Sequence, residues 1–281
     1  MSVVSPRVRS LNDIDMNASG EFVLYWMTAT RRYHYNAALD RAIEISLDLG
    51  KPLLVVECIS ARHEWSSERV LTFVVQGMVD NKSIFEQKGI SYVPWIENHI
   101  VSGDGMLSKL STKACAVVID DFPTYLPRWV MERASRTCKV SVEAVDSNGV
   151  LPMGYADGAH KTAYSFRKHM QKSLHRALST FPEEDSMENV ERDISFDMSR
   201  FSEIVDELDL EFPPLEWIWR VAEGGNVGRK AMEPLDIDHE VFPVDSVRGG
   251  YFSAISILEN FIERRLGNYS EGRNDAENPA V

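Results

Sequence analysis

The sequence predicts an α/β fold in which helices cover both faces of a doubly wound parallel sheet. Two observations carry this prediction. Short apolar runs rich in β-branched and aromatic residues recur five times in the first half of the chain, and such runs are typical of strands buried on both faces. Helical patterns separate these runs, so the order β-α-β-α-β-α-β-α-β favours right-handed crossovers between parallel strands.

The five expected strands all lie before residue 150. They cover residues 22–27, 52–59, 90–96, 116–120 and 139–145. The clearest helical patterns between them cover residues 36–49, 67–87 and 126–136. Gly50 and Gly89 follow two of these helices, where a left-handed residue often ends a helix. We therefore expect a Rossmann-like domain over residues 1–150.

Composition places the chain among folded proteins of one or two domains. Of its 281 residues, 44% are hydrophobic and 26% are charged, which excludes disorder throughout. No apolar run approaches the roughly 18 to 20 residues that span a bilayer, and residues 1–17 lack the apolar core of a signal peptide. These features favour a soluble, cytoplasmic protein.

Acidic charge gathers in one segment. Residues 181–216 contain thirteen acidic and two basic residues, so 2 − 13 = −11 of the net charge of −13 lies here. The prolines of this segment indicate an interdomain linker with short helices, best over residues 201–208, and we place the whole linker at residues 151–245. The simplest explanation of this acidic segment is a solvated surface, which would repel nucleic-acid phosphates.

Residues 161–178 have the opposite character. This helical pattern contains five Lys and Arg residues and no acid, and it carries an apolar stripe of Tyr164, Phe166, Met170, Leu174 and Leu178. Two interpretations stay open. The helix presents a face to phosphates of DNA or of a flavin, or its basic side is solvated or rests against the acidic linker.

Motifs for common nucleotide, metal and hydrolase chemistry are missing from the sequence. The stretch 224–230 is rich in glycine but fails the P-loop spacing. The three cysteines are isolated and the seven histidines do not cluster, so we expect no metal site. No Gly-x-Ser-x-Gly elbow occurs, and no catalytic residue is predicted.

Short segments spread over nearly the whole chain carry a resemblance. They are residues 7–13, 22–27, 35–39, 50–55, 162–167, 238–244, 249–250 and a last stretch from Phe261 to Asp275. In this order they resemble the N-terminal part of the DNA photolyase/cryptochrome family, most closely its class II and class II-like deoxyribodipyrimidine photolyases. In that family the last stretch carries a tyrosine that contacts flavin, and a Ser/Thr-x-Leu-Ser-Pro loop and a large helical domain follow.

The resemblance implies that residues 246–281 begin a helical FAD-binding domain that this chain leaves incomplete. It implies FAD contacts for Tyr269 and Arg273; the alternative for Tyr269 is an aromatic side chain that packs on its neighbour. In the parent protein, electron transfer from FAD splits cyclobutane pyrimidine dimers in UV-damaged DNA held by the missing domain. We expect this chain alone to be inactive and to self-associate through its uncovered last helix.

The resemblance also implies an antenna chromophore, a deazaflavin or a folate, in the α/β domain. Ligands of doubly wound sheets bind at the carboxyl ends of strands, near the point where strand order reverses. The loops expected there offer Tyr33, His34 and Asp120 as contacts. Three other functions stay open: a non-catalytic Rossmann-like module for a small ligand or partner, a cryptochrome-like photoreceptor fragment, and a nucleotide binder like electron-transfer flavoproteins.

Overall fold

The computed structural model describes residues 5–98, 101–156 and 158–273. The chain forms two compact units, each described here by itself. The first unit comprises Met1–Arg62 and Lys82–Pro213, and the second comprises His63–Asn81 and Pro214–Val281. Helix α2 (Glu68–Gln87) contributes residues to both units.

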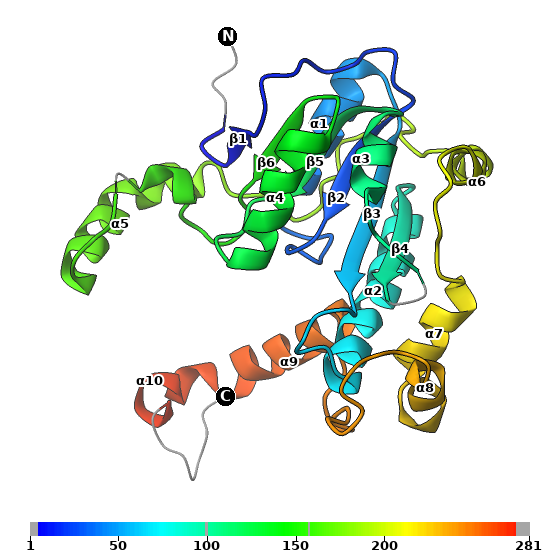
Figure 1. Ribbon diagram of the computed structural model, residues 1–281. Helices are drawn as coiled ribbons and strands as arrows, with labels where there is room; N and C mark the ends of the chain where they lie inside the picture. Colours follow the sequence, from blue (N-terminus) through cyan, green and yellow to red (C-terminus); the bar gives the residue numbers. More distant parts are fainter. Residues whose placement is uncertain (1–4, 99–100, 157, 274–281) are drawn as a thin grey trace. The chain divides into compact units, whose positions relative to one another are not determined.

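A six-stranded sheet of order β1-β6-β5-β2-β3-β4 forms the centre of the first unit (Figure 1). Its strands are β1 (Val8–Ser10), β2 (Phe22–Met27), β3 (Leu53–Ser60), β4 (Ser91–Glu97), β5 (Ala114–Asp120) and β6 (Val142–Val145). Strands β2 to β6 are the five expected strands, and all their pairings are parallel. Chain order reverses between β2 and β5, which confirms the doubly wound prediction.

The prediction of a purely parallel, five-stranded sheet was wrong in one detail. Strand β1 adds a sixth strand, antiparallel to β6, with Val8 opposite Val145. Strand β1 has only three residues and its sequence is Val-Arg-Ser, so it lacks the apolar run by which the other strands were found.

Helices cover both faces of this sheet. Helix α1 (Ala37–Leu49) packs on one face, whereas α3 (Met106–Ser111) and α4 (Tyr125–Thr137) pack on the other (Figure 1). The side chain of Asn36 caps α1 by accepting hydrogen bonds from the N–H groups of Ala38 and Leu39. Gly50 ends α1 in the left-handed conformation, with φ of 63°, as its position predicts.

Part of the acidic segment is packed against the sheet. Ile194 accepts a hydrogen bond from the Leu53 N–H at 2.7 Å, and the ring of Phe196 lies 5.0 Å from that of Phe22. Helix α6 (Met198–Glu207) buries Phe201 and Ile204 in the same hydrophobic core. The remaining helical elements of this unit are η1 (Met153–Tyr155) and α5 (Ala163–Leu178).

The second unit is helical. It contains α7 (Leu215–Glu223), α8 (Gly225–Met232), α9 (Tyr251–Arg264), the short η2 (Leu266–Asn268) and α10 (Tyr269–Gly272), together with the first part of α2. Helices α7 and α8 form a hairpin in which the Trp217 indole donates to the Ala231 carbonyl at 2.8 Å. Ile218, Val221 and Met232 are fully buried in it.

Candidate functional site

The switch point between β2 and β5 is organised by Asp120. This residue ends β5 and is only 1% exposed. One carboxylate oxygen accepts hydrogen bonds from the consecutive N–H groups of residues 28, 29 and 30 at 2.8, 2.7 and 3.1 Å, and the other accepts from the Tyr25 hydroxyl at 2.8 Å. Asp120 therefore shapes the loop after β2, and its oxygens are already occupied by partners within the chain.

Tyr33 and His34 lie in that loop and also have internal partners. Tyr33 is fully buried, and its ring meets Phe85 edge to face at 5.4 Å. Its hydroxyl donates to Asp185, and burial followed by this contact raises the pKa of Tyr33. His34 Nδ1 lies 2.9 Å from the Glu184 carbonyl oxygen. The structure thus places Tyr33, His34 and Asp120 at the carboxyl ends of β2 and β5, as the sequence predicts. The side chains of Tyr33 and Asp120 are buried there.

The carboxylate of Glu57, in β3, pairs with the same loop and was not predicted from the sequence. Glu57 is fully buried, and the Arg31 guanidinium lies 3.0 Å from its Oε1. The Tyr92 hydroxyl also donates to Glu57, so burial and then this carboxylate raise the pKa of Tyr92 well above its ordinary value. An acidic residue inside an otherwise apolar run, Leu-Leu-Val-Val-Glu-Cys, is the sequence feature that indicates such a buried ion pair.

Tyr269 and Arg273 lie at the end of the described chain. Tyr269 begins α10, is 37% exposed, and meets the Phe261 ring edge to face at 5.6 Å. Arg273 follows α10 and is exposed. Neither side chain lines the cavity described below, and their FAD contacts stay a prediction.

Helix α5 exposes both of its faces. Among its residues only Ala177 is buried, and the stripe of Phe166, Met170, Leu174 and Leu178 is 42%, 37%, 42% and 57% exposed. The helix meets η1 through His169 Nε2, which lies 2.8 Å from the Tyr155 carbonyl oxygen. A phosphate-binding role for this helix stays a prediction.

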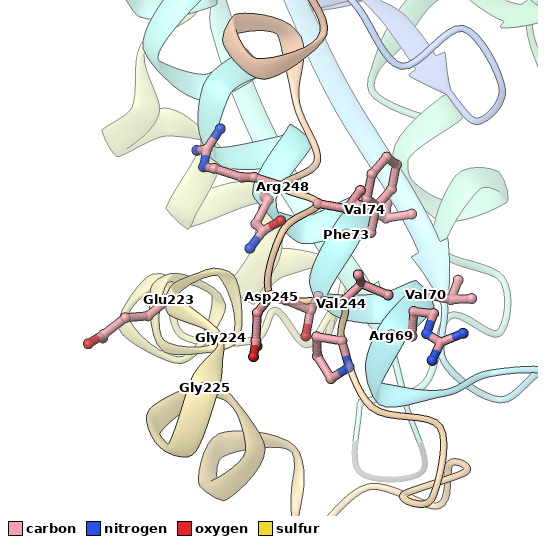
Figure 2. A pocket seen from close by; sticks show the side chains of 14 residues that line it. Arg69, Val70, Phe73, Val74, Glu223, Gly224, Gly225, Val244, Asp245 and Arg248 are labelled. Atoms are coloured by element: carbon pink, nitrogen blue, oxygen red, sulfur yellow. The ribbon is translucent and has the colours of Figure 1, made fainter. Parts of the chain in front are cut away.

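A cavity of about 500 Å³ lies within the second unit. Figure 2 shows that its lining comes from α2, from the turn between α7 and α8, and from the segment 243–248. Val70 and Phe73 supply apolar surface, and the glycine-rich stretch noted in the sequence supplies Gly224 and Gly225. Arg248 also lines the cavity, and its guanidinium pairs with Asp80 at 2.7 Å.

Three further observations concern membrane-spanning helices, metal-binding groups and cysteines among the residues that the structure describes. None of their helices is both long enough and apolar enough to cross a bilayer. Within residues 5–98, 101–156 and 158–273, no group of three or more His, Cys, Asp and Glu side chains could hold a metal ion. Cys58, Cys115 and Cys138 are free and buried, and burial raises the pKa of each thiol.

These observations define two units. One is a Rossmann-like α/β unit whose strand order reverses between β2 and β5, and the other is a smaller helical unit. The deoxyribodipyrimidine photo-lyase of Methanothermobacter thermautotrophicus is 28% identical to this chain over 270 residues, which are 96% of this chain and 53% of that protein. The predicted resemblance to photolyases is therefore confirmed, and the chain spans about half the length of the curated relative that it matches. No family model matches the chain.

One solved photolyase structure shares the fold of this chain. The bacterial class III photolyase from Agrobacterium tumefaciens superposes with a TM-score of 0.53 at 17% identity, covering 100% of this chain and 50% of that chain. An archaeal photolyase from Sulfolobus tokodaii, solved with two FAD molecules, has a TM-score of 0.42 at 13% identity and covers 74% of this chain and 48% of that one. The class II assignment made from the sequence stays a prediction.

Proposed function

We propose that this chain is the Rossmann-like part, the linker and the first FAD-domain helix of a photolyase-type protein. One observation carries the proposal: similarity to a deoxyribodipyrimidine photo-lyase runs through 96% of the chain, while the chain spans 53% of that protein. The complete protein would act on UV-damaged DNA in the cytoplasm. FAD, when bound there, supplies the light-driven electron that splits a cyclobutane pyrimidine dimer.

The described residues do not by themselves enclose a flavin. Tyr269 is more than a third exposed, and among the described residues its ring contacts that of Phe261. A tight cofactor site buries most of its ligand among many groups, so Tyr269 and Arg273 would form one wall of the FAD site at most. We therefore expect the chain alone to be inactive.

We propose that an antenna deazaflavin or folate binds at the carboxyl ends of β2 and β5, where strand order reverses. Because Tyr33 and Asp120 are buried, their role there is to set the shape of the loop. In the same loop Arg31 and His34 are half-buried, and Arg32 and Tyr35 are exposed. Titrating each chromophore while following its fluorescence tests this site; we expect micromolar or weaker binding, roughly −8 kcal/mol at best. Absence of binding at high micromolar concentration would remove the antenna from this edge.

Flavin content tests the main proposal. The purified chain should hold no stoichiometric flavin and should not repair irradiated DNA. A non-catalytic Rossmann-like module for a small ligand or partner and a cryptochrome-like photoreceptor fragment are the alternatives. A chain that binds flavin stoichiometrically would contradict the division of the FAD site proposed here.

A further inference from the structure

The cavity of the second unit is open to solvent and largely apolar. Its exposed apolar side chains, each between 41% and 51% accessible, are Val70, Phe73, Val244 and Val247. Gly224 and Gly225 form part of the wall and carry no side chain, which permits close approach of another backbone. Apolar side chains gathered at one exposed cavity indicate an interaction surface.

Charged side chains of opposite sign lie at the two ends of the lining. The Arg69 Nε donates to the Phe242 carbonyl at 2.8 Å, and Figure 2 shows Arg69 at the end opposite Glu223. Asp245 lines the cavity as well, whereas the other cation, Arg248, is already paired with a carboxylate of α2. An occupant that matches these charges would place acidic groups near Arg69 and a basic group near Glu223 or Asp245.

Helix α9, in the same unit, has the chemistry that this cavity would accept. Its apolar stripe recurs at spacings of three and four residues and consists of Ile255, Leu258 and Ile262. None of the residues of α9 is buried. Glu259 and Glu263 lie four residues apart beside the stripe, and Arg264 ends the helix. One helix therefore offers an apolar stripe, an acidic flank and a basic end.

The stripe of α9 cannot enter the cavity of its own chain. The start of the helix is fixed on α2, because the Gly249 N–H donates to Gln76 Oε1 at 2.8 Å and the Phe252 N–H donates to Asp80 Oδ2 at 3.2 Å. A continuous helix carries residue 262 about 16 Å from residue 251. Figure 1 shows α9 running away from α7 and α8, whose connecting turn lines the cavity. The helix that fits must come from another molecule.

We propose that the cavity receives helix α9 of a second copy of this chain. The stripe lies against Phe73 and Val244, and the acidic flank faces Arg69, as in other complexes in which an amphipathic helix binds a groove. Under two-fold symmetry each copy supplies one helix and one cavity, so the contact forms twice and closes as a dimer. This dimer requires neither a flavin nor an antenna, and it stands apart from the proposed function.

Mixed cross-linking of the full chain tests which surfaces meet. One chain carries Val244→Cys, the other carries Leu258→Cys, and a short bismaleimide reagent joins thiols that lie close together. The control mixture replaces the second chain with Asn260→Cys, whose thiol lies on the opposite side of α9. We expect about tenfold more mixed product from the first pair, because a bound helix holds its thiol at a high effective concentration. The three native cysteines are buried.

Light scattering over a concentration series measures the strength of the contact. Phe73→Glu and Leu258→Glu should each raise the dissociation constant about tenfold or more, because each replaces an apolar contact with a charge. Val227→Glu is the matched control, since Val227 is an apolar side chain of α8 that is 42% exposed and lies outside the cavity lining. Arg69→Glu should also weaken association, and adding Glu263→Arg to the same chain should restore much of it.

Equal cross-linking in the two mixtures would overturn the proposal, as would a folded Phe73→Glu chain that associates as tightly as the unaltered one. If Phe73→Glu fails to fold, the cross-linking result alone decides. Efficient cross-linking of Leu258→Cys chains to one another, without excess mixed product, would show that α9 packs on α9 and that the cavity is not its partner. A monomeric chain would contradict the proposal outright.

Discussion

The Tyr25 hydroxyl donates a hydrogen bond of 2.8 Å to Asp120 across the switch point between β2 and β5. Both side chains are buried, and burial followed by the Asp120 charge raises the pKa of Tyr25 well above its ordinary value. The same carboxylate holds three backbone N–H groups of the next loop. This pair therefore joins two neighbouring strands to the loop that faces the proposed ligand edge.

Asp120→Asn should destabilise the chain by about 2 kcal/mol in urea unfolding. The amide supplies one acceptor oxygen, and its NH₂ group faces a donor where the carboxylate had a second acceptor. Asp121→Asn is the matched control. Its partner Arg9 has a side chain that is 56% exposed, so the loss should stay within about 0.5 kcal/mol. Equal effects of the two changes would contradict the role of Asp120.

Gly250→Ala should destabilise the second unit by about 2 kcal/mol or more. Gly250 has φ of 105°, and an added Cβ would lie 2.2 Å from Asp80 Oδ2, which also accepts from the Phe252 N–H. Gly267→Ala meets open space and should change thermal stability little. If Gly250→Ala melts like the unaltered chain, the contact of Asp80 with the start of α9 is not structurally important.

The three thiols should react slowly with a disulfide reagent in the native chain. All three are buried, and burial raises their pKa values, so little thiolate is exposed at neutral pH. Unfolding in urea should make all three reactive. Rapid reaction of even one native thiol would show that its segment opens readily.

Helix α9 should drive self-association. None of its residues is buried; Phe252, Leu258 and Ile262 are 53%, 49% and 53% exposed, and Ile255 and Phe261 lie on the same helix. Light scattering should show association that weakens in a Leu258→Glu, Ile262→Glu double variant and on deletion of residues 246–281. Asn260→Glu adds charge away from this stripe and should have no effect. A monomeric unaltered chain would refute this expectation.

Sequence patterns located most of the first unit because buried parallel strands leave apolar runs that need no long-range information. Strand β2 matches its expected bounds, and Gly50 ends α1 as predicted. The sequence could not show that Ile194 and Phe196 pack on the sheet, because an acidic, proline-containing segment gives no periodic pattern by which to place them. Glu57 was missed for a related reason: its partner Arg31 is distant in sequence, and only the fold joins them.

The sequence predicted the location of the candidate site but not the contacts that its side chains make. Strand order fixes which loops meet at the switch point, so Tyr33, His34 and Asp120 were expected together. Tyr33 is buried by the side chains of Phe85 and Asp185, and Asp120 is buried against the backbone of the loop after β2. Strand order does not specify these contacts. Tyr269 and Arg273 remain predictions from the resemblance.

The most direct test of the photolyase-type assignment is the reading frame of the source DNA beyond the codon for Val281. We predict an in-frame continuation that encodes a Ser-x-Leu-Ser-Pro segment, followed by the helical region that would complete the flavin site beside Tyr269. A stop codon, or a continuation without that segment, would contradict the assignment and favour a stand-alone binding module.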